Sequence, residues 1–276
     1  MPLSDVRLVA TDMDGTLLDP AGEVDVAFYP LYQSLKRHGV RFVAASGRQY
    51  YNMRRKLAPI ADEITFAAEN GSLVREHGQD LLVEALDPGL AHELMARGRT
   101  LPTAKLVLCG KKTAYIEGGD PAFEAYVRRF FERVALVADL LAVADDDFLK
   151  VTLSDFNGTA EHTYPHFRAY EGDLKVKVSS ETWLDISAPK AHKGQALTFL
   201  QERWGVSPAQ TMVFGDYLND VEMMRTAEWS FAMANAHPDV KAAARHETLS
   251  NEAAGVTVVL RRLVEALEEA ERAAVG

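Results

Sequence analysis

The chain has 276 residues, 47% hydrophobic and 25% charged, so it can bury one large core or two modest ones. Its formal net charge of −10 at pH 7 argues against binding to nucleic acid, which needs a basic face, and means that an anionic substrate must be attracted by a local group of cations. The single cysteine, Cys109, excludes an internal disulfide. We recognise neither a leader nor an apolar run of the roughly 20 residues that a membrane span requires. We therefore expect a cytoplasmic protein.

The first predicted element is a buried strand that ends in two carboxylates. Residues 6–11 are mostly aliphatic or β-branched and lead into Asp12 and Asp14. A continuous apolar run indicates a strand covered on both faces, as in a parallel α/β sheet, and ligands bind beyond the carboxyl ends of such strands. Two carboxylates ~4 Å apart repel each other by ~4 kcal/mol at an effective dielectric constant of 20. We therefore expect a hard divalent cation beside them.

The next part of the chain alternates helices with strands, which predicts a parallel sheet with right-handed crossovers. Ser46 lies at the start of the second helix, in the position of an N-cap, and a helix N-terminus is also a ready site for an anion. After the last strand, Asn70-Gly71 is a strong turn dipeptide. The spacing of apolar residues predicts, in order, a helix over 26–36, a strand over 40–45, a helix to about residue 57 and a strand over 64–68.

From about residue 86 the pattern changes to short paired strands interleaved with helices, which predicts a separate mixed α/β module of ordinary domain size. We place this module at 86–187, inserted between two parts of a core at 1–85 and 188–276. Pro189 lies at the second boundary. The expected helices are 90–97, 121–133 and 159–170, and the expected strands are 106–108, 114–116, 148–153, 175–179 and 183–186.

After Pro189 the first pattern returns. A strand over 211–214 ends in Gly215-Asp216, and Asn219 and Asp220 come at the start of the next helix, where capping is the usual role. Lys193 begins a helix, and a single lysine in that position is most often a surface residue. The elements expected here are helices over 193–204, 220–226 and 256–273 and strands over 211–214 and 230–233.

Three predicted parallel strands end in polar groups that suit a metal or a phosphate, namely Asp12, Ser46 and Asp216. Lys193 begins an intervening helix. Each residue alone has an ordinary explanation as a turn former, a helix cap or a surface cation. Because the carboxyl ends of parallel strands meet at one edge of the sheet, the combination favours one site.

The combined motifs resemble those of the haloacid dehalogenase superfamily, specifically the Cof-type phosphatases of subfamily IIB, which carry a large α/β cap of the C2 type. Asp12-Met13-Asp14-Gly15-Thr16-Leu17 matches the DxDGT motif, and Ser46-Gly47-Arg48 matches the second motif. Lys193-Gly194 resembles the third, and Gly215-Asp216-Tyr217-Leu218-Asn219-Asp220 matches the GDxxND motif. The resemblance implies a Rossmann-like parallel-sheet core with an inserted mixed α/β cap.

The resemblance also implies a role for each motif residue. Asp12 would be the nucleophile, and Asp14 the general acid and then the general base. Mg²⁺ would be held by Asp12, by the backbone carbonyl of Asp14 and by Asp216, with Asp220 supporting the metal site from behind. The group that binds the phosphate or substrate would be Ser46, Gly47, Arg48, Lys193 and Asn219.

We therefore expect a Mg²⁺-dependent phosphatase that hydrolyses a small phosphorylated metabolite through an aspartyl phosphate. A sugar phosphate is the first expectation, followed by phosphorylated cofactors, and the inserted module would close over the substrate. The alternatives are a phosphomutase acting on a sugar phosphate and a regulatory protein that binds metal and phosphate without turnover. A P-loop NTPase is disfavoured because no Gly-x4-Gly-Lys-Ser/Thr loop occurs. We expect a monomer or a weak homodimer.

Overall fold

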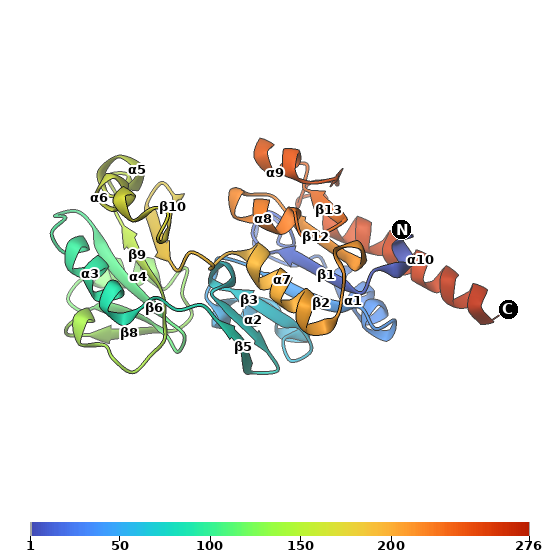
Figure 1. The fold of residues 1–276 in the computed structure, drawn as a ribbon, viewed down its shortest axis with the longest axis horizontal. Helices are drawn as coiled ribbons and strands as arrows, with labels where there is room; N and C mark the ends of the chain where they lie inside the picture. The colour runs from blue at the N-terminus through green and yellow to red at the C-terminus, as the bar shows by residue number, and fades with distance from the viewer. Residues whose placement is uncertain (1, 276) are drawn as a thin grey trace.

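The computed structural model describes residues 2–275, and these form two lobes, each built on its own β-sheet (Figure 1). The larger lobe takes its strands from both ends of the chain, and the smaller lobe is made from the middle. This arrangement confirms the expected α/β class, a largely parallel sheet with an inserted mixed module. Among the described helices, none has both the length and the apolar character that a membrane span requires.

The larger sheet runs in the order β14-β13-β12-β1-β2-β3-β4-β5, in which the first six strands are parallel to one another and the β3–β4 and β4–β5 pairs are antiparallel. These strands are Leu8–Asp12 (β1), Arg41–Ala45 (β2), Thr65–Ala68 (β3), Leu73–Glu76 (β4), Gln79–Val83 (β5), Thr211–Gly215 (β12), Trp229–Ala232 (β13) and His246–Glu247 (β14). Its helices are Phe28–Arg37 (α1), Tyr50–Lys56 (α2), Lys193–Trp204 (α7), Val221–Met224 (α8), Pro238–Ala243 (α9) and Gly255–Val275 (α10).

The position of β1 explains its apolar sequence. All five of its residues are buried, because β2 pairs with one edge, β12 with the other, and helices cover the faces of the sheet. Helices α7 and α8 pack together, as do α1 and α10. The long helix α10 extends beyond the larger lobe at the right of Figure 1. Asp12 thus lies at the end of a strand that is paired at both edges and packed on both faces.

The smaller lobe contains a six-stranded sheet in the order β10-β11-β9-β6-β7-β8, in which only the β7–β8 pair is parallel. Its strands are Lys105–Gly110 (β6), Ala114–Glu117 (β7), Val134–Val137 (β8), Phe148–Ser154 (β9), Lys175–Ser180 (β10) and Trp183–Ser187 (β11). Its helices are Pro88–Gly98 (α3), Pro121–Val127 (α4), Thr159–His162 (α5) and Tyr164–Phe167 (α6).

Two of the helices expected in this lobe are shorter than the sequence pattern indicated. The helix expected over 121–133 ends at Val127, and residues 128–133 form turns that lead into β8, which pairs with β7. The helix expected over 159–170 is interrupted at Thr163, whose φ is −108°, and resumes with Pro165 in the first turn of α6. Proline has no N–H for a helical hydrogen bond, so it suits the start of α6 and not the interior of one long helix.

Other elements were not predicted from the sequence. Strands β4, β5 and β14 and helix α9 are short, and their residues have weak periodicity. The turn expected at Asn70-Gly71 does occur: φ is 58° at Asn70 and 93° at Gly71, and β3 and β4 pair antiparallel across it.

Gly194 allows α7 to approach α8 closely. A Cβ atom at this position would lie 2.8 Å from the backbone carbonyl of Glu222, which cannot move aside as a flexible side chain could. We predict that Gly194→Ala lowers the free energy of unfolding by about 1–3 kcal/mol through overpacking. Urea unfolding followed by circular dichroism measures this change.

Gly118→Ala is the matched control, because no atom lies within 4 Å of a Cβ there. Its effect on the free energy of unfolding should be below about 0.5 kcal/mol. If Gly194→Ala were as stable as Gly118→Ala, the close packing of α7 on α8 would be contradicted.

Candidate active site

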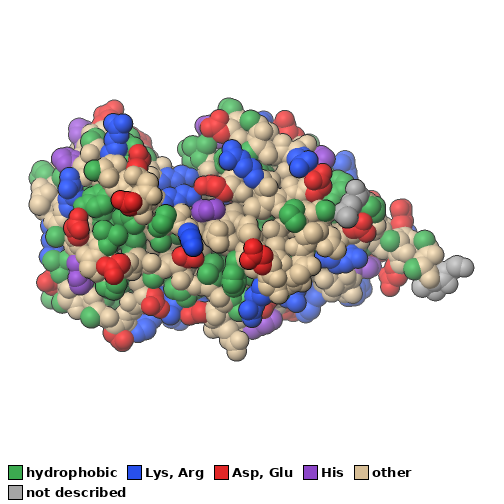
Figure 2. Space-filling view, in the orientation of Figure 1, with side chains coloured by type: hydrophobic (Ala, Val, Ile, Leu, Met, Phe, Trp, Pro, Cys, Tyr) green, Lys and Arg blue, Asp and Glu red, His purple; other side chains and the backbone are tan. Residues whose placement is uncertain are grey.

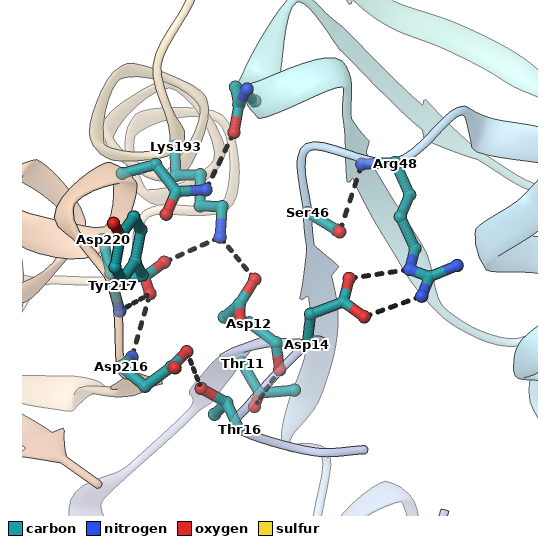
Figure 3. Close-up of polar contacts among 12 residues, drawn as sticks. Thr11, Asp12, Asp14, Thr16, Ser46, Arg48, Lys193, Asp216, Tyr217 and Asp220 are labelled. Carbon is teal, nitrogen blue, oxygen red and sulfur yellow. Dashed lines mark hydrogen bonds and ion pairs between the residues drawn. The ribbon is translucent and has the colours of Figure 1, made fainter. Parts of the chain in front are cut away.

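Polar residues from four neighbouring strands meet at the carboxyl edge of the larger sheet (Figure 3). Asp12 is the last residue of β1, Ser46 follows β2, Asp216 follows β12, and Asn70 lies in the turn after β3. Because β12, β1, β2 and β3 are adjacent in the sheet, the ends of the four strands form a single site.

Three carboxylates crowd around one buried lysine in this site. Oxygens of Asp12, Asp216 and Asp220 all lie within 4.8 Å of one another. The Nζ atom of Lys193 lies 2.5 Å from Asp12 Oδ1 and 2.7 Å from Asp220 Oδ1, and Lys193 is only 1% exposed. One ammonium leaves two negative charges uncompensated, which equals the charge of one divalent cation. Oxygen donors are also what Mg²⁺ prefers, so this donor set fits the expected metal.

The electrostatics of the cluster follow from burial and crowding. Burial raises the pKa of Asp12 well above its usual value, and the charges of Asp220 and Asp216 add to this effect while Lys193 opposes it. Burial, followed by the charge of Asp220, raises the pKa of Asp216 to about 6, although the Thr16 hydroxyl donates it a hydrogen bond of 2.9 Å. Burial lowers the pKa of Lys193, but Asp12 and Asp220 outweigh burial, so the net direction is upward. A cation beside the carboxylates would favour their ionised forms.

Asp220 organises the loop that carries Asp216. Its Oδ2 atom accepts hydrogen bonds from the backbone N–H groups of Asp216 and Tyr217 at 3.0 and 3.1 Å. This tight turn requires Gly215, because a Cβ there would lie 2.6 Å from the Asp220 Cβ. Gly15 is constrained in the same way: its φ is +74°, and a Cβ would lie 2.2 Å from Asp216 Oδ2. At Gly15 and Gly215 the absence of a Cβ atom therefore allows the main chain to lie close to the carboxylate cluster.

The Asp14 side chain does not join the cluster. It turns toward Arg48, whose Nε and Nη2 atoms each donate a 2.7 Å hydrogen bond to one carboxylate oxygen (Figure 3). Arg48 is itself held by Asn52, with 2.6 Å between Nη1 and Oδ1. The resemblance assigned the backbone carbonyl of Asp14 to the metal and its side chain to proton transfer. The ion pair with Arg48 therefore involves the group expected to transfer the proton, and not the expected metal ligand.

Ser46 has a different local role from the one expected. The N-cap of α2 is Gln49, whereas Ser46 lies three residues earlier and accepts a 3.2 Å hydrogen bond from the backbone N–H of Arg48. Ser46 is 1% exposed, and this hydrogen bond stabilises the bend between β2 and α2. On the opposite side of the site, Asn219 donates a 3.0 Å hydrogen bond to Asn70 Oδ1.

A cavity of about 660 Å³ connects this edge of the larger sheet with the smaller lobe. The two lobes meet below the notch at the top of the space-filling view (Figure 2). Of the predicted site residues, Lys193 and Asp220 do not line the cavity and are instead buried beside Asp12. Those that line it are Asp12, Asp14, Ser46, Gly47, Arg48, Asp216 and Asn219.

Residues of the smaller lobe that line the cavity were missed by sequence reasoning. One signal was available, because Lys150 and Thr152 alternate with apolar residues in the strand expected over 148–153, and a lysine in a buried strand is unusual. Cys109 is buried, and burial raises the pKa of its thiol. Chief among the missed residues are Tyr126, Phe130, Lys150, Thr152, Trp183 and Asp185.

The segment 128–133 of the smaller lobe docks on the N-terminal end of α2. The side-chain amide of Gln49 donates a 3.0 Å hydrogen bond to the Arg133 carbonyl and accepts one of 2.8 Å from the Arg133 N–H. The Arg133 guanidinium lies 3.5 Å from the centre of the Tyr51 ring, and Arg55 pairs with Glu132 at 2.7 Å. Gln49 follows Arg48 directly, so the lobe contact lies beside the predicted substrate-binding segment.

Comparisons with known proteins agree with the motifs and the fold. A family model described as haloacid dehalogenase-like hydrolase matches residues 9–260. The chain is 34% identical over 262 residues to 5-amino-6-(5-phospho-D-ribitylamino)uracil phosphatase YbjI of Escherichia coli, covering 94% of this chain and 96% of that protein. It is 29% identical over 243 residues to the HMP-PP phosphatase of Cronobacter sakazakii, covering 87% and 88%. The crystal structure of SMU.1108c from Streptococcus mutans superposes with a TM-score of 0.84 at 30% identity, covering 94% of this chain and 99% of that one.

Removing the Gln49 side chain should loosen the contact between the lobes. Each of its two hydrogen bonds to Arg133 contributes roughly 1 kcal/mol. We predict that Gln49→Ala speeds amide hydrogen exchange in segment 128–133 by about tenfold or more, measured by mass spectrometry. Gln33→Ala is the control, because Gln33 bonds Glu63 within the larger lobe. Unchanged exchange in Gln49→Ala would contradict the docking role.

Removing the Lys193 ammonium should leave Asp12 and Asp220 buried without their cation. We predict that Lys193→Met lowers the free energy of unfolding by about 3–5 kcal/mol at pH 8. Lys193 opposes the rise in the pKa of Asp12, so without the ammonium the Asp12 pKa in the folded state rises further and the folded variant binds a proton more tightly than its unfolded chain. The loss should therefore be smaller at pH 5.5 than at pH 8.

Urea unfolding at the two pH values measures this effect. Lys190→Met is the matched control, since Lys190 is exposed three residues away, and it should change the free energy of unfolding by less than about 0.5 kcal/mol. A Lys193→Met loss that is the same at both pH values would contradict the electrostatic explanation.

Proposed function

The chain belongs to the haloacid dehalogenase-like hydrolases, and from this membership we propose that it is a Mg²⁺-dependent phosphatase in which Asp12 is the nucleophile. The membership confirms the resemblance seen in its motifs. The chain is a phosphoric monoester hydrolase that acts on a small phosphorylated metabolite. The observation that carries the mechanistic proposal is the cluster of Asp12, Asp216 and Asp220 around the buried Lys193.

The proposed reaction has two steps. In the first, an Asp12 carboxylate oxygen forms a bond to phosphorus as the bond between phosphorus and the ester oxygen breaks, and Asp14 gives a proton to the departing oxygen. In the second, Asp14 takes a proton from water as the water oxygen attacks the aspartyl phosphate, which releases inorganic phosphate and restores Asp12. An aspartate at position 14 supports hydrolysis of an ester, whose leaving oxygen needs a proton.

Lys193 positions the nucleophile in this proposal. Its contact with Asp12 Oδ1 holds the carboxylate at the end of β1, and Asp220 holds Lys193 from the other side. Bound Mg²⁺, held by Asp12, Asp216 and the Asp14 carbonyl, would neutralise charge on the phosphoryl oxygens. Ser46, Gly47 and Asn219 line the same cavity and are proposed to contact the phosphoryl group.

Arg48 adds a requirement for the proton transfer. Both Asp14 oxygens accept a hydrogen bond from the Arg48 guanidinium, and this pairing competes with a contact between the Asp14 carboxyl and the oxygen of a leaving group. We propose that the incoming phosphoryl group draws Arg48 away from Asp14, because a guanidinium binds phosphate oxygens in the same bidentate way as it binds a carboxylate.

The module at 86–187 is proposed to be the cap that selects the substrate. It supplies one wall of the cavity, including Lys150 and Asp185, whereas the core at 1–85 and 188–276 supplies the residues proposed for chemistry. A sugar phosphate or a phosphorylated cofactor is the proposed substrate. We also propose a cytoplasmic location, since the single Cys109 cannot form an internal disulfide.

We predict metal-dependent phosphate release from members of a panel of phosphorylated metabolites. Release should require Mg²⁺, cease with chelator, and fall by at least about a thousandfold in Asp12→Asn. Asp62→Asn is the control, because the Asp62 side chain is 82% exposed and lies outside the site. It should retain full activity.

The other outcomes separate the alternatives. Absence of metal-dependent release from every panel member would refute the phosphatase proposal, and release that persists in Asp12→Asn would refute the nucleophile. Conversion of a hexose 1-phosphate to the 6-phosphate without free phosphate would identify a phosphomutase.

A further inference from the structure

The sheet of the smaller lobe has two chemically different faces. Side chains alternate along each strand, so Val151 and Leu153 of β9 and Leu184 and Ile186 of β11 lie on one face, in the hydrophobic core that also contains residues of α3. The opposite face, which borders the cavity, carries the residues between them. Its members at the cavity are Lys150, Thr152, Trp183 and Asp185.

Two polar residues of this face, Lys150 and Thr152, are buried, although such a face usually contacts solvent. Lys150 is 5% exposed and Thr152 is 2% exposed. Lys150 Nζ lies 2.9 Å from Glu69 Oε2 of the larger lobe and 3.6 Å from Asp185 Oδ2. Burying an ion pair costs several kcal/mol per ion before the ions attract each other, so this arrangement is not explained by stability.

Asp185 keeps unused capacity to accept hydrogen bonds. Its Oδ1 atom accepts a 2.7 Å hydrogen bond from Thr152, and its Oδ2 atom has the more distant Lys150. A carboxylate has about four lone-pair positions, so at least two remain for a ligand in the cavity. A hydroxyl or amine of a ligand can donate to these positions, whereas a second phosphate or a carboxylate would be repelled.

The charges around Asp185 favour the same type of ligand. Lys150 is already paired with Glu69 and lies near Asp185, so it carries no uncompensated positive charge. Arg48, across the cavity, is paired with Asp14. Lys177 pairs in register with Asp185 across β10 and β11, and both line a small adjoining pocket, but Lys177 does not line the main cavity. Among the described residues that line the main cavity, the cations are Arg48 and Lys150, and both already have an anionic partner, so the main cavity offers no unpaired cation to a second anionic group.

An aromatic wall lies beside the polar group. Tyr126 and Trp183 stack with their ring centres 5.3 Å apart and their planes at 12°, and Phe130 meets the Trp183 ring edge-on at 5.6 Å. All three line the cavity. They offer an apolar surface to one side of a ligand whose donors face Asp185.

We propose that Asp185, held by Thr152 and Lys150, is the specificity-determining residue for the leaving group, and that the substrate is a phosphate monoester whose leaving group carries hydroxyl or amine donors and no second anionic group. This inference rests on the proposed function, because it places the phosphoryl group at Asp12 on the opposite wall. Asp185 and Asp12 come from different lobes, so different residues would select the leaving group and carry out the reaction. Asp185 takes no part in the reaction itself.

The test compares matched pairs of ligands as competitive inhibitors of p-nitrophenyl phosphate hydrolysis with Mg²⁺. The pairs are glucose 6-phosphate with 6-phosphogluconate, and fructose 1-phosphate with fructose 1,6-bisphosphate. In the wild type the member with one anionic group should inhibit at least about tenfold more tightly. Asp185→Asn, which keeps the size and the acceptor for Thr152, should reduce this ratio to about threefold or less. Asp185→Glu, which keeps the charge, should retain most of it.

The ratio of inhibition constants is the readout because a general loss of folding or catalysis affects both members of a pair equally. Asp173→Asn, an exposed carboxylate of the same lobe, is the control and should leave the ratio unchanged. Equal inhibition within each pair in the wild type, or a ratio unaffected by Asp185→Asn, overturns this inference and leaves the proposed function intact. Absence of any Mg²⁺-dependent p-nitrophenyl phosphate hydrolysis overturns the proposed function and this inference with it.

Discussion

The contact of the Lys193 ammonium with Asp12 and Asp220 is the interaction on which the site depends. A buried ammonium without partners would cost several kcal/mol, as would each buried carboxylate, so these groups are stable only together. Their meeting requires β1, β12 and α7 to approach within hydrogen-bond distance of one another's side chains. Close packing at Gly194 and the turn at Gly215 make that approach possible. The remaining negative charge is what makes the site suited to a divalent metal.

The two lobes divide the work of the proposed enzyme. The larger lobe holds the charged groups that the reaction needs at the ends of adjacent parallel strands, where the sheet itself fixes their spacing. The smaller lobe presents the polar and aromatic face of an antiparallel sheet to the same cavity. Relatives that match nearly the full chain carry the names of phosphatases for different compounds. This is consistent with a common reaction in the core and a selective wall in the inserted module.

Sequence patterns predicted the central strands of the core best, for a physical reason. Strands β1, β2 and β12 are covered on both faces, so their apolar runs are unbroken and easy to recognise. In the smaller lobe, β8 forms because Val134–Val137 pairs with β7, and that pairing is invisible in the local sequence. Ser46 was expected to cap a helix, but α2 begins after Gln49, which has its own contact across the lobes.

The sequence by itself determined the buried strands at the centre of the core and the chemistry at their ends, because apolar runs and motif residues are local features. It placed Asp12, Asp216 and Lys193 in one site, since parallel strands bring their carboxyl ends together. Only the tertiary structure decided that Asp14 turns to Arg48 and that Lys150 and Asp185 line the cavity. Those contacts join segments far apart in the chain, and their partners are set by how the two lobes pack, which no local pattern encodes.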